Sequence, residues 1–233
     1  MEVLVTEIAT QRDQDRVREV NVEGTRLIDA ARVAGTPRLV FASTVVTGDA
    51  QGELLTEDAP LPVQTAYGQS KQDGEALVRD CGLPSVILRP SHVYGPGGWY
   101  ASEIVGRLRQ PGRFAVVGGG ANWWDVVHVE DVATAFAEAM QRAPAGAIYH
   151  VADDQPIRYA EFVGLTATAL GLGRPRHVPV WPARLAAGPD PVRAVVRSAR
   201  SSNARIKSEL GYSLRFPSAG AGIPDAVARL AAA

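Results

Sequence analysis

Two residues in the first third of the chain, Tyr67 and Lys71, have the types and the spacing that acid–base chemistry at an oxygen atom requires. Residues four apart on a helix lie on the same face, one turn from each other. An ammonium group beside a phenol favours the ionised phenol and lowers a pKa that starts near ~10. The pair therefore predicts a proton carrier for hydride transfer or epimerisation at a hydroxyl group. An ordinary exposed helix with a lone tyrosine is the alternative.

Alternating apolar and polar runs around this pair are typical of an α/β protein with a parallel sheet. The pattern predicts one helix from about Asp13 to Ala34 and a second that carries Tyr67 and ends near Gly82. From about Tyr159 the chain is predicted to be mostly helical. Short continuous apolar runs, typical of buried parallel strands, are Val3–Val5, Leu39–Phe41, Val86–Leu88, Val126–Val129 and Ile148–Val151.

The composition describes an ordinary globular protein of 233 residues, 46% hydrophobic and 21% charged. A net charge of −1 argues against nucleic acid or an anionic membrane as a partner. Cys81 is the only cysteine and the four histidines are scattered, so we expect no disulfide and no metal site. No signal peptide or membrane-spanning run is recognisable, which predicts a cytoplasmic protein.

Seven short segments follow one another in an order and spacing that a known family shares. They are Asn21–Thr25 (NVEGT), Leu39–Thr44 (LVFAST), Tyr67–Lys71 (YGQSK), Leu88–Pro96 (LRPSHVYGP), Asp125–Ala133 (DVVHVEDVA), Tyr149–Ala152 (YHVA) and Lys207–Tyr212 (KSELGY). Through these segments the chain, from about Asn21 to Leu230, resembles the extended short-chain dehydrogenases/reductases, the group that contains NAD-dependent epimerases and dehydratases.

The resemblance implies a role for several residues. It implies that Tyr67 is the acid/base and that Lys71 tunes it and contacts the nicotinamide ribose. It implies that Ser43 hydrogen-bonds the substrate oxygen, although a structural serine at a turn is the alternative. It also implies that Pro90 to Val93 line the nicotinamide end of an NAD(P) cofactor.

The chain departs from the family at the site that holds the cofactor's pyrophosphate. Family members begin with a strand, a GxxGxxG turn and a helix whose backbone amides bind that group. No such turn is present, and the glycines at 95–98 and 118–120 are predicted to form ordinary turns. Loss of the pyrophosphate site predicts that the chain loses most of its affinity for a dinucleotide.

We therefore expect an α/β fold: a truncated Rossmann-like doubly wound parallel sheet with its first three strands absent, and a small mixed C-terminal substrate lobe. Residues 1–95 and 124–152 are expected to form the core, and residues 96–123 and 153–233 the lobe, in one interleaved unit. Removing three strands would leave Val3–Val5 at a bare sheet edge. This predicts a homo-oligomer, or a complementing chain, that covers the first strand.

The substrate class is predicted from residues beside the expected site. Sugar-nucleotide dehydratases of the family carry an Asp-Glu pair after the catalytic Ser or Thr, where this chain has Thr44 and Val45. Trp123 and Trp124 stand where many nucleotide-sugar enzymes have an arginine suited to a diphosphate. Together with Thr44, the substrate residues are predicted to be His92, Tyr94, Trp123 and Trp124, around a small and fairly apolar molecule. Core packing is the alternative for both tryptophans.

Three functions remain open on the sequence. The first is an NAD(P)-type oxidoreductase or epimerase that acts on a hydroxyl or carbonyl group. The second is a cofactor-independent acid/base enzyme of the isomerase, cyclase, aldolase or lyase type, since polarising a carbonyl with two hydroxyl donors needs no dinucleotide. The third is a non-catalytic module that binds a small ligand or a partner protein. We favour the first because so much of the oxidoreductase pattern is present.

Overall fold

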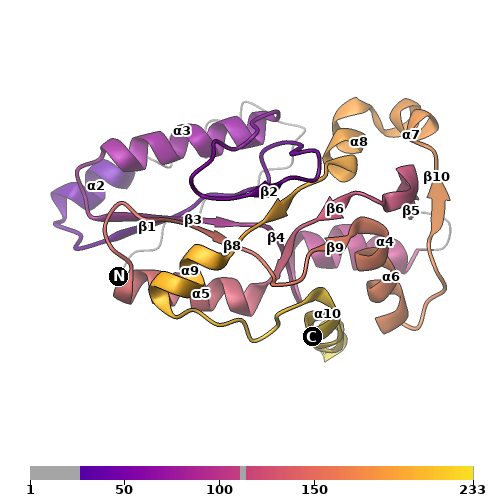
Figure 1. Cartoon of the computed structure of the whole chain (residues 1–233). Coiled ribbons are helices and arrows are strands. Elements are labelled where there is room, and N and C mark those ends of the chain that lie inside the picture. The colour runs from indigo at the N-terminus through magenta and orange to yellow at the C-terminus, as the bar shows by residue number, and fades with distance from the viewer. Residues whose placement is uncertain (1–26, 111–113, 233) are drawn as a thin grey trace.

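A three-stranded parallel sheet, in the left half of Figure 1, lies between two layers of helices in the computed structural model, which describes residues 27–110 and 114–232. Its strand order is β1-β3-β8, and all three strands run in the same direction. These strands are β1 (Leu39–Ala42), β3 (Ser85–Pro90) and β8 (Ile148–Val151). The predicted parallel α/β architecture is confirmed, while the expected strand Val3–Val5 lies outside the described residues.

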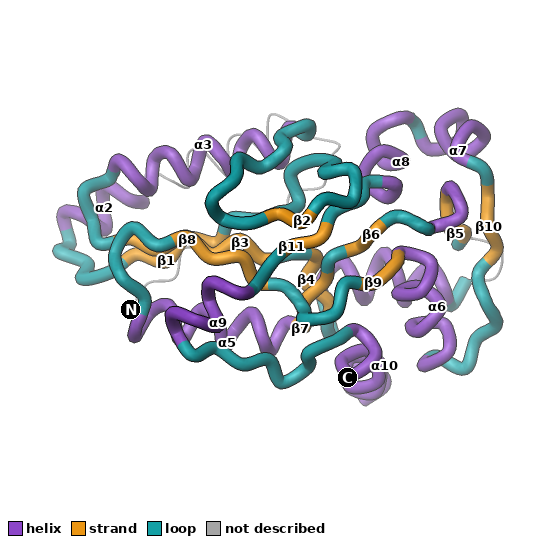
Figure 2. Tube along the Cα trace, in the orientation of Figure 1, coloured by secondary structure: helices purple, strands orange, loops and turns teal. Residues whose placement is uncertain are grey.

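The side chains of the sheet alternate between two helix layers, as successive residues of a strand must. Leu39, Phe41 and Ile87 pack on one face with Val78 of α3 (Ala66–Asp80). The intervening residues pack on the other face, against α5 (Val129–Arg142) and α9 (Ala204–Leu210); they include Val40, Val86, Leu88 and Tyr149. Figure 2 shows these strands between α3 on one side and α5 and α9 on the other. The doubly wound arrangement is therefore present in the described part of the sheet.

The remaining elements are two-stranded sheets and further helices. The paired strands are β10 (Arg176–Val178) with β5 (Ala115–Val117), β11 (Arg200–Ser201) with β2 (Leu54–Leu55), β4 (His92–Tyr94) with β7 (Val126–His128), and β6 (Trp123–Trp124) with β9 (Ile157–Arg158). The further helices are α2 (Leu27–Val33), α4 (Gly106–Leu108), α6 (Tyr159–Ala169), α7 (Val180–Ala187), α8 (Pro189–Val196) and α10 (Ala219–Ala232). A π-helical turn spans Tyr100–Val105, and a 3-10 turn occupies the predicted glycine turn Gly118–Gly120.

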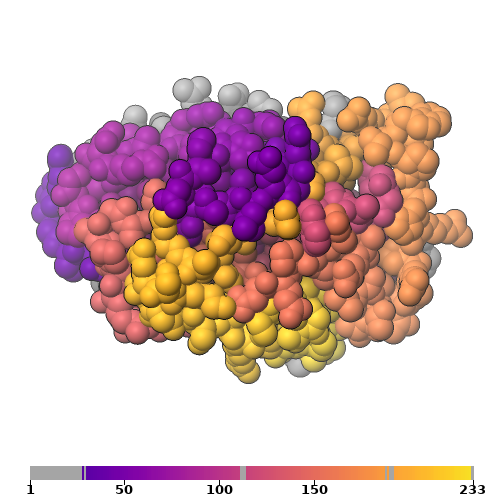
Figure 3. All heavy atoms as spheres, viewed as in Figure 1, coloured from indigo at the N-terminus to yellow at the C-terminus, as the bar shows by residue number. Residues whose placement is uncertain are grey.

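The part of the chain expected to form a substrate lobe has its own core, but the predicted division does not separate every element. Buried residues of β4, β6, β9, α6 and α10 form one apolar cluster that includes Tyr94, Tyr100 and Phe162. Helix α9, which the sequence division assigns to the lobe, instead packs on the main sheet through Ile206 and Leu210. Figure 3 shows the gold surface of this C-terminal segment against the indigo segment that precedes α3. The last third of the chain therefore contributes to both parts.

Two glycines allow the predicted helix α3 to lie close to the residues beneath it. A Cβ on Gly74 would stand 2.7 Å from the ring of Phe41, and one on Gly68 would stand 2.8 Å from the backbone of Thr47. The Thr65 hydroxyl caps the helix by accepting a hydrogen bond from the Gly68 amide at 2.9 Å. The helix that carries Tyr67 is thus fixed at its start and along its buried face.

We expect Gly74→Ala to destabilise the fold by about 1–3 kcal/mol, because the added methyl group overlaps the Phe41 ring in a packed core. Gly164→Ala is the matched control, since a Cβ there meets no atom within 4 Å and alanine favours a helix by up to about 1 kcal/mol. Urea unfolding of both variants measures the difference. Equal stability of the two variants would show that α3 does not depend on this close approach.

Candidate active site

Tyr67 and Lys71 lie together on α3 at the carboxyl end of β1, as the spacing of four residues predicts. The ammonium of Lys71 is 2% exposed, 5.9 Å from the centre of the Tyr67 ring, and donates a hydrogen bond to the Ala42 carbonyl at 3.1 Å. Carboxyl ends of parallel strands are where ligands of such sheets bind. The two residues therefore stand where the family's chemistry is expected.

The predicted lowering of the Tyr67 pKa by Lys71 is not found. Burial raises the pKa of Tyr67 to about 12, and a hydrogen bond with Thr44 opposes this shift without cancelling it. Burial also lowers the pKa of Lys71 to about 8. At neutral pH the phenol consequently keeps its proton and can give it away, which suits the reduction of a carbonyl group.

The structure places Thr44, and not Ser43, beside the phenol of Tyr67. Ser43 is buried and donates a hydrogen bond to the Glu75 carboxylate at 2.5 Å. Thr44 lies near enough to the Tyr67 phenol to oppose its pKa shift, and its own Oγ1 donates to the Pro90 carbonyl at 3.1 Å. Successive residues at the end of a strand point in opposite directions, so only one of the two hydroxyls can face the phenol. The Ser43 hydroxyl, expected at the substrate oxygen, is thus bound to Glu75, and Thr44 is a second candidate for that position.

A buried ion pair that sequence reasoning missed fixes α3 to the sheet. The Glu75 carboxylate, 0% exposed, accepts two hydrogen bonds from the Arg89 guanidinium of β3, at 2.8 Å and 2.7 Å. Such two-pronged pairing is specific in its geometry as well as strong. A signal was present in the sequence, because Tyr67, Lys71 and Glu75 are spaced at four-residue intervals and so share one helix face.

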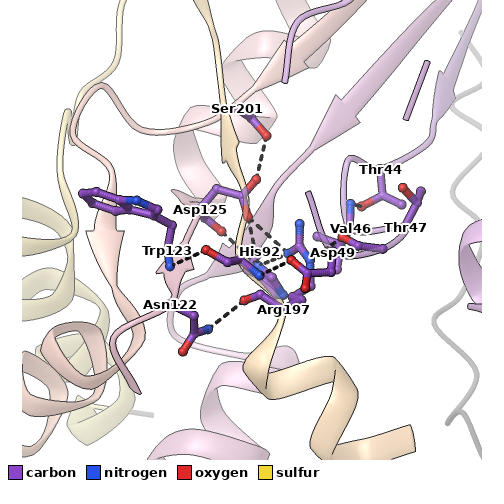
Figure 4. A network of polar contacts seen from close by, with 12 residues as sticks. Thr44, Val46, Thr47, Asp49, His92, Asn122, Trp123, Asp125, Arg197 and Ser201 are labelled. Atoms are coloured by element: carbon purple, nitrogen blue, oxygen red, sulfur yellow. Dashed lines mark hydrogen bonds and ion pairs between the residues drawn. The ribbon is translucent and has the colours of Figure 1, made fainter. Parts of the chain in front are cut away.

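His92 and Trp124 stack on each other on the lobe side of the same strand ends. Their ring centres are 3.8 Å apart with the planes 19° from parallel. Asp125 lies next to this stack and accepts hydrogen bonds from Arg197 at 3.2 Å and from Ser201 at 2.6 Å (Figure 4). Burial alone would raise the pKa of Asp125, but Arg197 and the bonds from His92 and Ser201 hold that pKa well below its usual range. Asp125 is thus a charged anchor for the stack.

The other predicted site residues lie in different surroundings. Tyr94 is fully buried in the lobe core, against Tyr100 and Phe162, so its predicted place in a substrate pocket is corrected to a core position. The Arg158 guanidinium lies over the Trp123 ring, 3.5 Å from the centre of that ring. Trp123 is not part of the stack of His92 and Trp124. Besides Lys71, the predicted cofactor contacts are Pro90 and Val93. The Pro90 carbonyl accepts the hydrogen bond from Thr44, and Val93 is half-buried.

Asp153 is, like Glu75, a buried acidic residue that the sequence did not point to. Neither of its carboxylate oxygens has a hydrogen-bond partner among the described residues. Burial, together with the charges of Asp131 and Asp154, raises the pKa of Asp153 to about 8. The folded protein therefore keeps a proton on Asp153 that the unfolded chain releases above pH ~4.

We expect Asp153→Asn to stabilise the protein increasingly as the pH rises from 5 to 8. Across this window the folded state holds one more proton than the unfolded state, so stability falls with pH by at most about 1.4 kcal/mol per unit, a dependence that asparagine removes. The gain should reach on the order of 3 kcal/mol at pH 8, measured by urea unfolding. Asp58→Asn is the control, because it weakens an exposed ion pair with Arg205, is not among the charges that raise the Asp153 pKa, and should cost under about 1 kcal/mol. A gain independent of pH would contradict the raised pKa.

The described residues fit the nicotinamide end of a dinucleotide better than its pyrophosphate end. Lys71 offers a buried ammonium one helix turn from a phenol, the donor set that a ribose hydroxyl and a reacting oxygen need. In the described ranges, no glycine turn leads into a helix in the manner of a pyrophosphate site. Nor do those ranges contain a group of three or more acidic, histidine or cysteine residues that could hold a metal ion, or a helix long and apolar enough to cross a membrane.

The sequence matches a family model over residues 7–152, and that model describes the NAD dependent epimerase/dehydratase family. Together with the α/β fold and the Tyr67–Lys71 pair, this match identifies the chain as a member of that family. The resemblance inferred from the seven segments is confirmed.

Several characterised relatives are about a third identical to the chain over the residues that align. A 3-diazoavenalumate denitrifying reductase of a Streptomyces species is 32% identical over 208 residues, which are 85% of this chain and 68% of that protein. A 3beta-hydroxysteroid-dehydrogenase/decarboxylase of Arabidopsis thaliana is 32% identical over 177 residues, 67% of this chain and 40% of that protein. A 2-alkyl-3-oxoalkanoate reductase of Stenotrophomonas maltophilia is 30% identical over 69% of this chain and 53% of its own length. The chain thus spans only part of each relative.

Solved structures share the fold over nearly the whole chain. RMD from Pseudomonas aeruginosa, complexed with NADPH, superposes with a TM-score of 0.77 at 21% identity and covers 99% of this chain and 80% of its own. The dTDP-glucose 4,6-dehydratase DesIV from Streptomyces venezuelae, with NAD bound, has a TM-score of 0.80 at 27% identity over 97% of this chain and 70% of its own. Both structures hold a nicotinamide cofactor.

Proposed function

We propose that the protein is an NAD(P)-dependent oxidoreductase that interconverts a carbonyl and a hydroxyl group on a small, fairly apolar substrate. The observation that carries the proposal is the position of Tyr67, near Thr44 and one helix turn from the buried ammonium of Lys71. A phenol and a second hydroxyl that meet at one point are suited to bind a single substrate oxygen.

The chemistry follows from the protonation of these groups. A bound nicotinamide would supply or accept the hydride. Tyr67, protonated at neutral pH, would donate its proton to the oxygen of the carbonyl as negative charge develops there. The Thr44 hydroxyl would turn from the Pro90 carbonyl to hydrogen-bond the same oxygen, and Lys71 would bind the cofactor's ribose.

Aromatic side chains on the lobe side support an apolar substrate. Trp124 and His92 are stacked, and Trp99 meets the edge of the same imidazole at 5.9 Å between ring centres. Two of the relatives, an oxoalkanoate reductase and a hydroxysteroid dehydrogenase, have names that point to substrates other than nucleotide sugars, and this chain lacks the Asp-Glu pair of the sugar-nucleotide dehydratases. The proposed substrate therefore presents a carbonyl to Thr44 and Tyr67 and an apolar part to the tryptophans.

The first test is a calorimetric titration with NADH and NADPH, followed by an assay of nicotinamide oxidation with alkyl and aryl ketones. Micromolar binding of either cofactor and ketone-dependent oxidation would support the proposal. No binding at millimolar cofactor would refute it for this chain and would favour the cofactor-independent reading of the same residues.

A comparison of Thr44→Val with Ser43→Ala separates the two hydroxyls. We expect Thr44→Val to lower kcat about 10²–10³-fold, the usual cost of losing one hydrogen-bond donor to a developing oxyanion. Ser43→Ala should change kcat little and lower stability by about 1–3 kcal/mol, because it removes one of the hydrogen bonds to the buried Glu75 carboxylate. Steady-state kinetics and urea unfolding of both variants give the answer, and the reverse ranking in kcat would return the catalytic role to Ser43.

A further inference from the structure

His92 is held rigidly at the carboxyl end of the sheet, beside the loop that carries Thr44. It is the first residue of β4 and lies two residues after Pro90, whose carbonyl accepts the hydrogen bond from Thr44. Its imidazole stacks on Trp124 and makes a T-shaped contact with Trp99, and its side chain is only 13% exposed. An imidazole clamped in this way has little freedom to rotate, so each ring nitrogen keeps a fixed direction.

The surroundings of Nδ1 determine which nitrogen carries the proton. Nδ1 lies 2.9 Å from the Asp125 carbonyl oxygen and 3.5 Å from the Asp125 carboxylate. Both oxygens are acceptors, and a carbonyl oxygen can only accept, so Nδ1 must carry a hydrogen. The Arg197 nitrogen 3.4 Å from Nδ1 is itself a donor and therefore cannot bond to a protonated Nδ1. Arg197 instead binds the Asp125 carboxylate at 3.2 Å.

The other nitrogen, Nε2, is then an acceptor. Burial, with a further contribution from the Arg197 charge, lowers the pKa of His92, although Asp125 opposes the shift, so the ring is neutral at neutral pH. Unlike the buried Nε2 atoms of His128 and His150, the Nε2 atom of His92 is not sealed from solvent, and it makes no hydrogen bond with any residue in the described ranges. A neutral imidazole with Nδ1 protonated presents a lone pair at Nε2.

Asp125 is held so that it keeps this arrangement. Its carboxylate receives hydrogen bonds from Arg197 and from Ser201, both on the segment that leaves α8 (Figure 4). Because Arg197 balances the negative charge, Asp125 orients the imidazole without drawing it into the cationic form. Arg197 also donates from Nε to the Gly48 carbonyl, which ties this group to the loop that follows Thr44.

We propose that Nε2 of His92 accepts a hydrogen bond from the substrate, so that the substrate carries a hydroxyl or N–H group near the carbon that reacts. The inference rests on the proposed function and narrows its substrate class from simple ketones to ketones with a neighbouring hydrogen-bond donor, such as hydroxyketones. Tyr67 and Thr44 bind the reacting oxygen, and His92 accepts the hydrogen bond from the neighbouring hydroxyl or N–H group of the substrate. His92 is thus a specificity-determining residue that Asp125 positions.

The state of His92 can be tested on the wild-type protein without any turnover. Imidazole nitrogens labelled with a magnetic isotope distinguish the two tautomers by NMR, and the signal of His92 is assigned by its loss in His92→Phe. We expect a neutral ring with the proton on Nδ1 at pH 7. A neutral ring with the proton on Nε2, or a cationic ring, would overturn the proposal.

Chemical modification tests whether Nε2 is accessible. Diethylpyrocarbonate acylates neutral, accessible imidazoles, and peptide mass analysis locates the product. We expect His92 to react, along with the exposed His177, while the fully buried His128 and His150 stay unmodified. A rate for His92 as low as that of His128 would overturn the proposal. Because neither this experiment nor the NMR needs a cofactor, failure of the proposed hydride transfer would not be mistaken for failure of this inference.

Kinetics then test the recognition itself. His92→Phe keeps a ring against Trp124 but removes the acceptor, and His177→Phe is the control on β10. For a hydroxyketone that the wild type reduces, we expect kcat/KM of His92→Phe to fall about 10-fold, the value of one hydrogen bond. For the matching ketone without the hydroxyl we expect no change. An equal loss for both ketones would show that His92 has a structural role only.

Discussion

Tyr67→Phe is expected to lower kcat for carbonyl reduction by about 10²–10⁴-fold, the range that a positioned general acid supplies. The phenylalanine fills the same volume, so α3 and the residues beneath it should keep their packing. Removing a buried hydroxyl takes away the proton donor and one of the two hydrogen bonds proposed for the reacting oxygen. Cofactor affinity should be nearly unchanged, because Lys71 and not Tyr67 is the residue proposed to bind the ribose.

Tyr100→Phe is the matched control for this variant. Tyr100 is buried in the lobe core, away from the proposed chemistry, and its hydroxyl meets the Thr166 hydroxyl at 3.1 Å. Thr166 keeps a second bond, to the Phe162 carbonyl, so the substitution leaves no buried hydroxyl unpaired. Stopped-flow or steady-state rates should differ between the variants by at least two orders of magnitude. If Tyr67→Phe retained wild-type kcat, Tyr67 would not be the acid.

Glu75→Gln is expected to be the most destabilising conservative change in the site, by about 3–5 kcal/mol. The substitution leaves the Arg89 guanidinium, 5% exposed, without its buried counter-charge, and it weakens the bond from Ser43. Urea unfolding at neutral pH measures the loss. Because Glu75 also fixes the face of α3 that carries Lys71, the folded fraction should bind the cofactor more weakly.

An exposed pair of the same type provides the comparison. Glu103 and Arg107 form an ion pair with both side chains more than half accessible, so Glu103→Gln should cost under about 1 kcal/mol. Adding Arg89→Met to Glu75→Gln should recover part of the loss, since the double variant no longer buries an unpaired charge. A cost for Glu75→Gln no larger than that for Glu103→Gln would mean that water reaches the pair.

The central strands and the helix with Tyr67 could be predicted from the sequence because their signals are local. Leu39–Phe41 and Val86–Leu88 are continuous apolar runs, and the structure places them in β1 and β3. The choice between Ser43 and Thr44 could not be made in this way. It depends on the direction of one side chain at the end of a strand, and on a buried carboxylate 32 residues away.

The pKa of Tyr67 shows a second limit of the sequence. Helical spacing correctly places an ammonium one turn from the phenol, but it carries no information on how deeply either group is buried. Desolvation dominates here and moves the pKa in the opposite direction from a nearby positive charge. Tyr94 and Trp123 teach the same point, because membership of a motif did not reveal which of its aromatic rings faces a core.

The bond from Arg197 to the Gly48 carbonyl spans 149 positions of the chain and has a consequence for protein engineering. A chimera that takes its C-terminal lobe from another family member would lose this contact unless the donor supplies an arginine at the same place. Asp125 would then keep Ser201 or its replacement as a partner but lose its cation. Exchange of substrate lobes between relatives should therefore succeed only when residues 48, 125 and 197 are transferred as a set.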